Sequence, residues 1–344
     1  MIDGLPVGTD DTSGVATWRD PRWRAGALEW AVGELARAGL ELDGEPEQPH
    51  VRVWSTAFRL PLRGGTVAWL KCVGPGSAQE PVLAGALGGW VPDRVLVPLA
   101  VEPARRLLLL PDGGATLRAS GAGVAVWADV LRAYAGLQLD LVPHAAAMLG
   151  LGVPDTRPAH LPGQVDDLVA DDEAQLTGRP GGLEPAVRRR LVADRDAVVR
   201  ACRELADGGL PATVQHDDLH DANVFVSGGR YRFFDWGDAS LSHPFLSLLV
   251  ALRMAGRALE LPDGDPALHR LRDAYLEPWS AYGSPAELRA QCDLALRVAP
   301  LARALTWRRL LRGVHPAERA EWAGSVADWT AEYLRPGPLA GGAS

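Results

Sequence analysis

Lysine is nearly absent from this chain of 344 residues. Among its 35 Lys and Arg side chains, Lys71 is the only lysine. The two residue types are not interchangeable, because lysine offers a compact ammonium charge and arginine a planar fork of donors. In a chain that uses arginine everywhere else, the single lysine indicates a site that needs an ammonium group.

Cysteine is scarce as well. The three cysteines, Cys72, Cys202 and Cys292, are odd in number and far apart. This pattern suggests neither a disulfide framework nor a CxxC metal site. We expect reduced thiols, and we interpret Cys72, beside Lys71, as a structural strand residue although a lowered thiol pKa there is the alternative.

Long hydrophobic runs are missing. No apolar stretch reaches the roughly 18 residues that a membrane span requires. Residues 1–6 lack the basic and apolar segments of a secretory signal. We therefore expect a cytoplasmic protein that does not associate with membranes.

An excess of positive charge is also missing. The formal net charge of −8 argues against a nucleic-acid partner, because a general nucleic-acid binder needs a basic face to neutralise phosphates. The acidic balance is compatible with a cationic substrate without indicating one. With 47% hydrophobic residues, the chain can build substantial cores in one large or two ordinary domains.

The first third of the sequence mixes helical and strand-like patterns, after a loose arm that we expect over residues 1–20. The predicted elements are a helix over 21–40, strands over 51–60 and 66–73 joined by a Gly64-Gly65 turn, a helix over 77–89, and strands over 95–101 and 106–110. Residues 21–112 are therefore predicted to form a small sheet with an inserted helix.

The pattern is mainly helical from residue 113 onward. The predicted elements are a hinge over 111–120, a helix after Gly123, a Pro- and Asp-rich connection over 150–182, a helix over 184–206, and later helices broken at Pro262, Pro266, 283–285 and Gly313. Residues 337–344 are expected to be a disordered tail. Together the patterns predict an α+β fold with a helical lobe over residues 113–336.

Residues 216–238 carry the strongest chemical signal. Asp218 is followed five residues later by Asn223 and seventeen residues later by Asp235, with a Gly-Gly turn between two apolar runs in the interval. Phosphoryl transfer needs a carboxylate near the acceptor hydroxyl and oxygen ligands that hold Mg²⁺ on the nucleotide phosphates. The spacing matches the catalytic and metal-binding loops of protein kinases.

The motif resembles that of the aminoglycoside phosphotransferase and choline-kinase-like family. The family's loop H-G-D-L-H-x-x-N is matched by His216, Asp218, Leu219, His220 and Asn223, and its D-x-G-D by residues 235–238. The resemblance implies a protein-kinase-like bilobal fold. It also implies an enzyme that phosphorylates a hydroxyl group of a small polar molecule with ATP, or GTP, and Mg²⁺.

The resemblance also implies roles for individual residues. Asp218 would accept or orient the hydroxyl proton. The other implied roles are metal binding by Asn223 and Asp235, nucleotide binding by Lys71, Glu80, Ser55 and Thr56, support of the site by His216, His220 and Asp238, and binding of adenine by the backbone of residues 106–114.

The sequence departs from the family pattern at three places, one of which is Ser247, where many relatives carry an acidic residue. Asp217 stands where a glycine is usual, which adds a carboxylate beside the presumed base. No G-x-G-x-x-G loop precedes Lys71, so hydroxyl and backbone groups near Ser55 and Thr56 would have to contact the phosphates.

Three features have structural alternatives. Glu80 either pairs with Lys71 or completes a capping box with Ser77. The tryptophans 279, 307, 322 and 329 are either core residues or line a substrate cleft. The acidic residues between 166 and 173 form either a solvated loop or a site for a cationic acceptor.

Two other classes of function remain alongside the kinase. A catalytically silent pseudokinase would bind nucleotide without turnover, although the base, the lysine and the metal ligands are all present. An HD-type phosphohydrolase is suggested by His216-Asp217, but it would need further metal ligands, and the nearest upstream histidine is His160. The sequence does not identify the acceptor, which could be aminoglycoside-like, an amino alcohol or a sugar, nor the oligomeric state.

Overall fold

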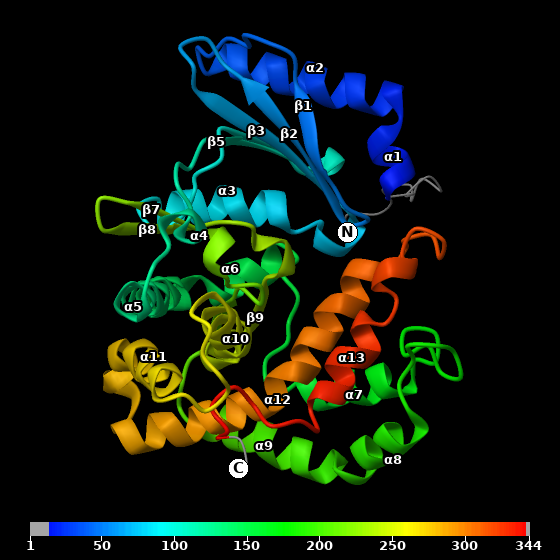
Figure 1. Cartoon of the computed structure of the whole chain (residues 1–344), viewed down its shortest axis with the longest axis vertical. Helices are drawn as coiled ribbons and strands as arrows, with labels where there is room; N and C mark the ends of the chain where they lie inside the picture. The colour runs from blue at the N-terminus through cyan, green and yellow to red at the C-terminus, as the bar shows by residue number, and fades with distance from the viewer. Residues whose placement is uncertain (1–13, 342–344) are drawn as a thin grey trace.

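The computed structural model describes residues 14–341, which form two lobes (Figure 1). The small lobe contains an antiparallel five-stranded sheet in the order β1-β2-β3-β5-β4. Its elements are α1 (Val15–Arg19), α2 (Pro21–Arg37), β1 (Glu47–Val51), β2 (Ser55–Pro61), β3 (Val67–Val73), α3 (Glu80–Trp90), β4 (Ala100–Glu102) and β5 (Leu107–Pro111).

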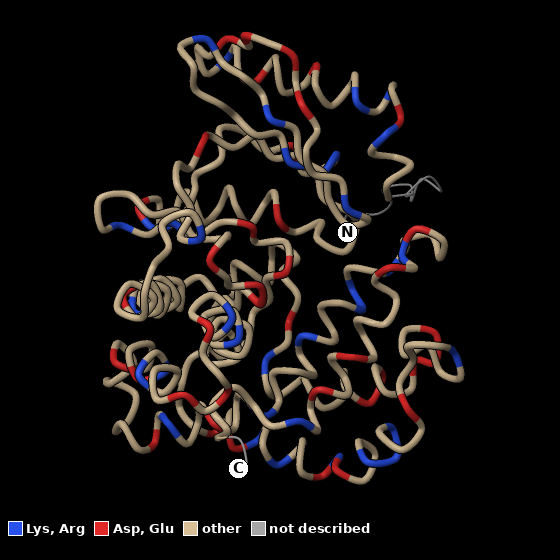
Figure 2. Tube along the Cα trace, in the orientation of Figure 1, with Lys and Arg blue, Asp and Glu red and all other residues tan. Residues whose placement is uncertain are grey.

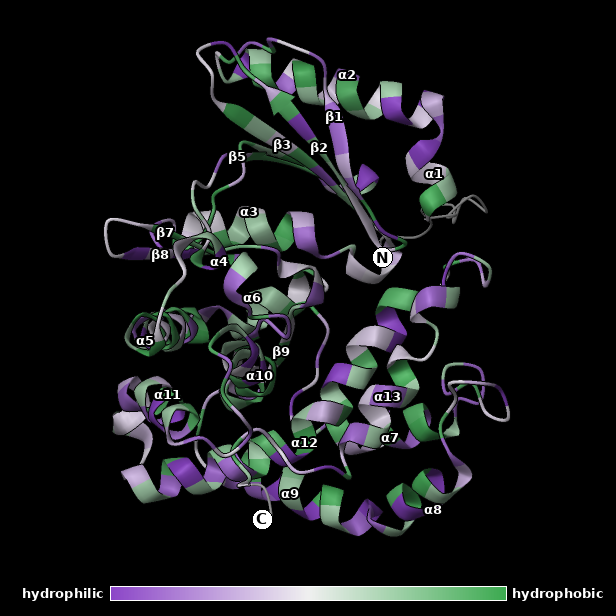
Figure 3. Cartoon of the chain, in the orientation of Figure 1, coloured by the Kyte–Doolittle hydropathy of each residue, from purple (hydrophilic) through white to green (hydrophobic). Residues whose placement is uncertain are grey.

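Helix α2 confirms the prediction of a helix after Pro21. The Asp20 side chain accepts hydrogen bonds from two backbone amides of the first turn, and proline occupies a first-turn position where its missing N–H costs nothing. The helix buries Ala27, Ala31 and Leu35 against the sheet. Figure 3 shows hydrophobic and hydrophilic residues alternating along α2. The hydrophobic ones at helical spacing face the sheet, and the opposite face of the helix is left for solvent.

The strand predictions are partly wrong. The hairpin of β2 and β3 is confirmed, and Gly64 and Gly65 turn it at φ values of 91° and 80°. The single strand predicted over 51–60 is instead two strands, β1 and β2, which turn at residues 52–54 and pair with each other. The strand predicted over 95–101 is reduced to β4.

The described parts of the two segments that were predicted to be loose, residues 14–20 and 337–341, make ordered contacts. Helix α1 lies inside the segment expected to be a loose arm, and the buried Trp18 indole donates a hydrogen bond of 2.7 Å to the Arg52 carbonyl. Near the other end, the Gly264 amide donates to the Pro338 carbonyl at 2.9 Å. Residues 1–13 and 342–344 lie outside the described part of the chain.

The large lobe is mainly helical, as predicted. Its helices are α4 (Leu117–Ser120), α5 (Val124–Leu141), α6 (Ala145–Gly150), α7 (Leu161–Ala170), α8 (Pro185–Ala193), α9 (Arg195–Asp207), α10 (Leu248–Ala258), α11 (Pro266–Leu276), α12 (Pro285–Leu311) and α13 (Ser325–Glu332). Two small sheets pair β6 (Thr213–Gln215) with β9 (Ser240–Ser242) and β7 (Val224–Ser227) with β8 (Arg230–Phe233).

Three features of this lobe bear on the sequence predictions. Helix α7 occupies part of the connection predicted over 150–182. The prediction of an irregular segment there was therefore partly wrong. The predicted break at 283–285 is the start of α12, where Ser284 and Glu287 form a capping box. Acidic and basic residues are interspersed along both lobes (Figure 2), and no helix within residues 14–341 is long and apolar enough to cross a membrane.

Helix α12 joins the two lobes. Trp307 on α12 and Trp322 pack edge-on against Trp54, which lies at the β1–β2 turn, with ring centroids 5.4 and 5.0 Å from that of Trp54. The helix backbone also lies directly against Gly76 of the small lobe. The structure thus holds the tip of the β1–β2 turn against the large lobe.

Gly76→Ala is expected to destabilise this contact. A Cβ at residue 76 would lie 2.5 Å from the Arg309 carbonyl oxygen and 2.7 Å from the Leu310 Cα, and neither backbone atom can rotate away. Such overpacking lowers the free energy of unfolding by about 1–3 kcal/mol, measurable by urea denaturation. The matched control is Gly89→Ala in α3, where a Cβ meets nothing within 4 Å; it should stabilise the protein slightly, by about 0.5–1 kcal/mol. Equal stability of the two variants would contradict this prediction.

Candidate active site

Lys71 connects the two lobes through paired charges. Its Nζ lies 2.6 and 2.8 Å from the two carboxylate oxygens of Glu80 and 2.6 Å from Oδ1 of Asp235. Burial alone would lower the pKa of Lys71, but the two carboxylates outweigh it and hold the pKa above its usual range. The predicted Lys71–Glu80 ion pair is therefore confirmed as a contact.

The capping-box alternative for Glu80 is wrong. Ser77 lies in a separate 3₁₀ turn over Pro75–Ser77, and α3 begins only at Glu80, with no side-chain hydrogen bond from its N-cap residue Gln79. Glu80 is buried at the first position of the helix, where a negative charge also complements the helix dipole. Its direction is set by Lys71.

The β7–β8 hairpin positions the two carboxylate loops. Gly228 and Gly229 turn the hairpin at φ values of 56° and 75°, which only glycine adopts readily. The imidazole of the buried His216 donates through Nε2 to the Phe234 carbonyl at 2.8 Å and accepts from the Asp218 amide at 3.4 Å. His216 therefore ties the loop of Asp218 to the residue that precedes Asp235, as its supporting role predicts.

Asp218 lies among three polar partners. Its Oδ2 is 3.4 Å from Nε2 of His220 and 3.5 Å from Nδ2 of Asn223, while its Oδ1 is 3.2 Å from Arg303. Burial would raise the pKa of Asp218, but Arg303 and then His220 lower it well below the usual range. The side chain of Asp218 is 33% exposed and that of Asp235 is 43% exposed, so both carboxylates remain accessible to a ligand.

Asp217 is the buried carboxylate of the cluster. It is only 3% exposed. Its φ of 62° is a left-handed conformation that glycine adopts readily, and glycine is the usual residue here in the family that the motif resembles. Gln215 donates to its Oδ1 at 2.8 Å, and Arg303 lies 3.5 Å from its Oδ2. Burial raises the pKa of Asp217 to about 6, against the lowering effect of Arg303.

The raised pKa of Asp217 predicts a pH-dependent stability. A carboxyl whose pKa rises from 3.8 to about 6 on folding stabilises the protein fully below pH 3.8, and this stabilisation is lost as the pH rises through about 6. The shift corresponds to about 3 kcal/mol. Asp217→Gly should therefore gain stability relative to the wild type between pH 4 and 7, measured by denaturant unfolding. A constant difference across this range would show that Asp217 does not titrate there.

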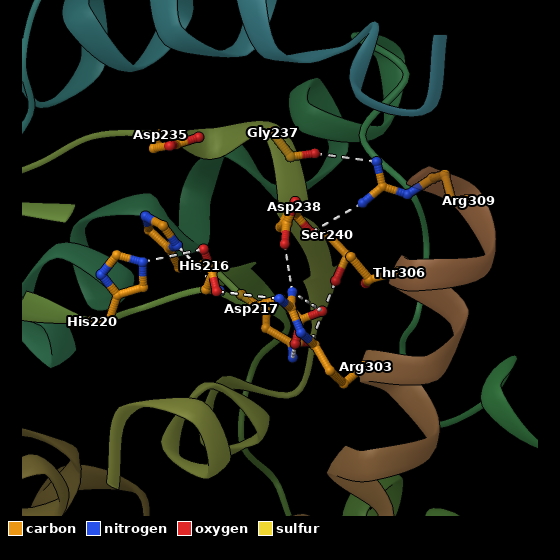
Figure 4. Close-up of polar contacts among 12 residues, drawn as sticks. His216, Asp217, His220, Asp235, Gly237, Asp238, Ser240, Arg303, Thr306 and Arg309 are labelled. Atoms are coloured by element: carbon orange, nitrogen blue, oxygen red, sulfur yellow. Dashed lines mark hydrogen bonds and ion pairs between the residues drawn. The ribbon is translucent and has the colours of Figure 1, made fainter. Parts of the chain in front are cut away.

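Arg303 belongs to the site but was missed by the sequence analysis. It lies on α12, is 5% exposed, and pairs with Asp217 and Asp238 (Figure 4) and with Asp218. One signal was present: residue 303 follows Leu296 and Ala299 at helical spacing on a face that is otherwise apolar. A charge there must be buried, and a buried charge needs a partner.

Asp238 joins this cluster through Arg303, at 2.5 Å from its Nη1. Nearby, Arg309 donates to the carbonyl oxygens of Gly76, Gly237 and Asp238, so one guanidinium connects the small lobe to the segment that follows Asp235 (Figure 4). This arrangement accounts for the supporting role expected of Asp238.

Ser55 and Thr56 lie on opposite faces of the sheet. Successive strand residues point to opposite sides, and the register pairs Thr56 with Cys72, one residue away from Lys71. The Thr56 hydroxyl donates to the His50 carbonyl at 2.8 Å and is fully buried. Ser55 shares the face of Lys71, whereas the structure does not bring Thr56 to the site as predicted.

The tryptophans and the acidic segment also have clear positions. Trp279 is a fully buried core residue, whereas Trp307 and Trp329 contact the Arg303 guanidinium. Four of the five acidic side chains between residues 166 and 173 have arginine partners: Asp166 pairs with Arg195, Asp171 with Arg308, Asp172 with Arg188 and Glu173 with Arg319. The fifth, Asp167, lines a neighbouring cavity.

A cavity of about 770 Å³ lies beside the carboxylate cluster. Ser240, Thr306 and Arg309 line it, together with polar and apolar residues of the 154–176 and 305–326 segments. Lys71, Asp218 and Asp235 do not line it. The reacting groups therefore belong to the carboxylate cluster, and the cavity lies next to that cluster without containing these groups.

The donor set near Asp235 suits Mg²⁺ bound to a nucleotide. Magnesium is usually held by one or two protein carboxylates together with substrate phosphates. Asp235, with an exposed carboxylate, and the amide oxygen of Asn223 can supply such a partial set. Among residues 14–341 there is no group of three or more His, Cys, Asp or Glu side chains placed to hold a metal.

Solved structures confirm the bilobal kinase-like fold. Macrolide 2′-phosphotransferase MphH from Brachybacterium faecium is 19% identical, with a TM-score of 0.55 over 90% of this chain and 98% of that one. Ethanolamine kinase from Plasmodium vivax is 11% identical, with a TM-score of 0.62 over 92% and 90%. The GDP complex of aminoglycoside 2′-phosphotransferase-IIIa is 13% identical, with a TM-score of 0.58 over 89% and 98%.

Family relationship rests on sequence. No protein with a curated function matches the chain. The model of the phosphotransferase enzyme family matches residues 113–290, just over half of the sequence, and this stretch contains Asp218, Asn223 and Asp235. The chain therefore belongs to the phosphotransferase enzyme family, and it is a small-molecule kinase.

Proposed function

We propose that this enzyme transfers the γ-phosphoryl group of ATP, bound with Mg²⁺, to a hydroxyl group of a small polar molecule. One observation carries the proposal: Lys71 of the small lobe lies 2.6 Å from Asp235 of the large lobe, although 164 residues separate them. The contact brings the ammonium group of the single lysine to the loop that carries Asp235. Phosphoryl transfer requires such positioned charges around a triphosphate.

Lys71 binds the α- and β-phosphates in this proposal, and Glu80 holds its ammonium in place. Asn223 and Asp235 hold Mg²⁺ through their oxygen atoms. The bound metal neutralises charge on the phosphate oxygens. Because Asp235 contacts Lys71 directly, bound phosphates would be attracted by the Lys71 ammonium itself and by the Mg²⁺ that Asp235 would hold.

Asp218 orients the acceptor hydroxyl and takes its proton. Its lowered pKa makes it a weak base, but it is ionised at neutral pH and available as a hydrogen-bond acceptor. A weak base is sufficient, because the transition state of phosphoryl transfer is loose and catalysis depends mainly on positioning and electrostatic stabilisation. The backbone of residues 106–114 is the site that we propose for the adenine ring.

We propose that the cavity beside the site holds the body of the acceptor, while its reacting hydroxyl lies outside the cavity at Asp218. A volume of about 770 Å³ falls within the range of pockets that hold drug-sized ligands. Its walls carry both charges, including Asp171 and Glu173 and their arginine partners. The structurally similar enzymes are named for macrolide, aminoglycoside and ethanolamine phosphorylation, so compounds of these classes and sugars are the first candidates.

The test is consumption of ATP with Mg²⁺ across a panel of macrolides, aminoglycosides, amino alcohols and sugars. A phosphorylated product, identified by mass spectrometry, supports the kinase. Nucleotide binding by calorimetry with no product across the panel would favour the pseudokinase. Release of phosphate from a monoester without ATP would favour a phosphohydrolase and overturn the proposal.

A further inference from the structure

We propose that Arg303 is a positioning residue for phosphoryl transfer, which fixes the carboxylate of Asp218 from helix α12. This inference rests on the proposed function of Asp218. Residue 303 lies outside the segment 113–290 that the family model matches. The guanidinium therefore extends the active site into a part of the chain whose role neither the motif nor the family indicates.

Arg303 holds one oxygen of Asp218 while the catalytic loop holds the other. Its Nη2 lies 3.2 Å from Oδ1, and Oδ2 faces His220 at 3.4 Å and Asn223 at 3.5 Å. Contacts on both oxygens fix the plane of the carboxylate. Because each oxygen can accept more than one hydrogen bond, acceptor capacity remains for a substrate hydroxyl.

The guanidinium is itself held rigidly. Its Nη1 pairs with Asp238 at 2.5 Å, and its Cζ lies 5.7 Å from the ring centroid of Trp307 and 6.0 Å from that of Trp329. Such aromatic contacts favour a fixed guanidinium orientation. Asp238 and the two rings therefore determine where Nη2 points, and with it the position of Asp218.

The Arg303 guanidinium also balances the negative charge of the carboxylates around it. Three carboxylates, Asp217, Asp218 and Asp238, surround one guanidinium. Removing one partner from a buried charge cluster is far more costly than removing an exposed ion pair. A purely structural role for Arg303, neutralising Asp217, is the competing explanation that an experiment has to separate.

Helix α12 connects the position of Asp218 to the cavity proposed for the acceptor. Thr306 follows Arg303 after three residues and Arg309 follows Thr306 after three more, so each is a neighbour of the one before it on the helix surface. Thr306 and Arg309 both line the cavity proposed for the acceptor. The helix that forms a wall of the cavity therefore also holds the base. A small displacement of α12 would move Asp218 relative to the bound acceptor.

The first experiment compares Arg303→Met with Arg303→Lys, using MgATP and the acceptor found in the substrate panel. We expect Arg303→Met to lower kcat on the order of 100-fold, the loss that a misplaced catalytic group causes, with the Kd for MgATP nearly unchanged. Arg303→Lys should recover part of kcat. Arg200→Met on α9, an exposed arginine, is the matched control and should behave as wild type. A normal kcat in Arg303→Met would overturn the proposal.

A double variant separates positioning from neutralisation. Asp217→Gly/Arg303→Met removes the buried carboxylate together with its counter-charge, and glycine suits the φ of 62° at residue 217. If Arg303 only neutralises Asp217, the double variant recovers both stability and kcat. The proposal predicts partial recovery of stability, because Asp218 and Asp238 also lose their partner, without recovery of kcat.

A crystal structure of the double variant decides the question without any substrate. We expect the Asp218 carboxylate to leave its present orientation, while Lys71 keeps its contacts with Glu80 and Asp235. An unchanged Asp218 orientation would overturn the proposal. If the wild type does not turn over ATP with any acceptor, the proposed function fails, but this comparison still tests whether Arg303 positions Asp218.

Discussion

Asp218→Asn is expected to abolish most phosphoryl transfer while leaving MgATP binding intact. The amide keeps the size of the side chain, and its oxygen can still accept from Arg303, but its NH2 group cannot accept from His220 and the amide cannot take a proton. Loss of a positioned acid–base group lowers rates by about 10²–10⁴-fold. The measurement is kcat for the identified acceptor, with the Kd for MgATP from calorimetry.

The control for this variant is Asp263→Asn, which changes an exposed carboxylate in the turn before α11. It should leave both constants unchanged. Full activity of Asp218→Asn would mean that another group receives the proton. Loss of MgATP binding in Asp218→Asn would instead mean that Asp218 belongs to the nucleotide site.

Asp235→Asn is expected to weaken binding of the magnesium nucleotide itself. Asparagine is preferred to alanine for this test, because residue 235 has a φ of 67° and asparagine tolerates this left-handed conformation. Loss of one charged ligand contact costs up to about 3 kcal/mol, which corresponds to about a 100-fold higher Kd.

The measurement compares calorimetric titrations with ATP in excess Mg²⁺ and with ATP in EDTA. The effect of Asp235→Asn should be large with magnesium and small without it, because the proposed role is to bind the metal. An equal loss in both titrations would show that Asp235 acts only through Lys71, its partner at 2.6 Å. An unchanged Kd would remove Asp235 from the nucleotide site.

The carboxylate loops could be predicted because their geometry is local. Asp218, Asn223 and Asp235 lie within eighteen residues along the chain, and the hairpin between them turns at two glycines. Register in a hairpin is set by the turn and by the alternation of side chains. Spacing alone therefore placed these groups together.

The errors in the small lobe have a different origin. Thr56 and Ser55 are adjacent in sequence, but only the pairing of β2 with β3 decides which of them shares a face with Lys71. A shift of one residue in a strand exchanges its faces. The break between β1 and β2 was missed because Val53 and Trp54 continue an apolar strand pattern while they pack against the large lobe.

By itself, the sequence determined the kind of chemistry. Composition and short-range spacing are enough to recognise the single lysine, the carboxylate loops and the helical periodicity. None of these features depends on how the chain packs. The tertiary structure alone decided that Lys71 meets Asp235 and that Arg303 meets Asp218, 85 residues away in sequence. Helical spacing shows which face of α12 is buried, but the partner of a buried charge depends on which elements pack there, and that is settled only when the whole chain folds.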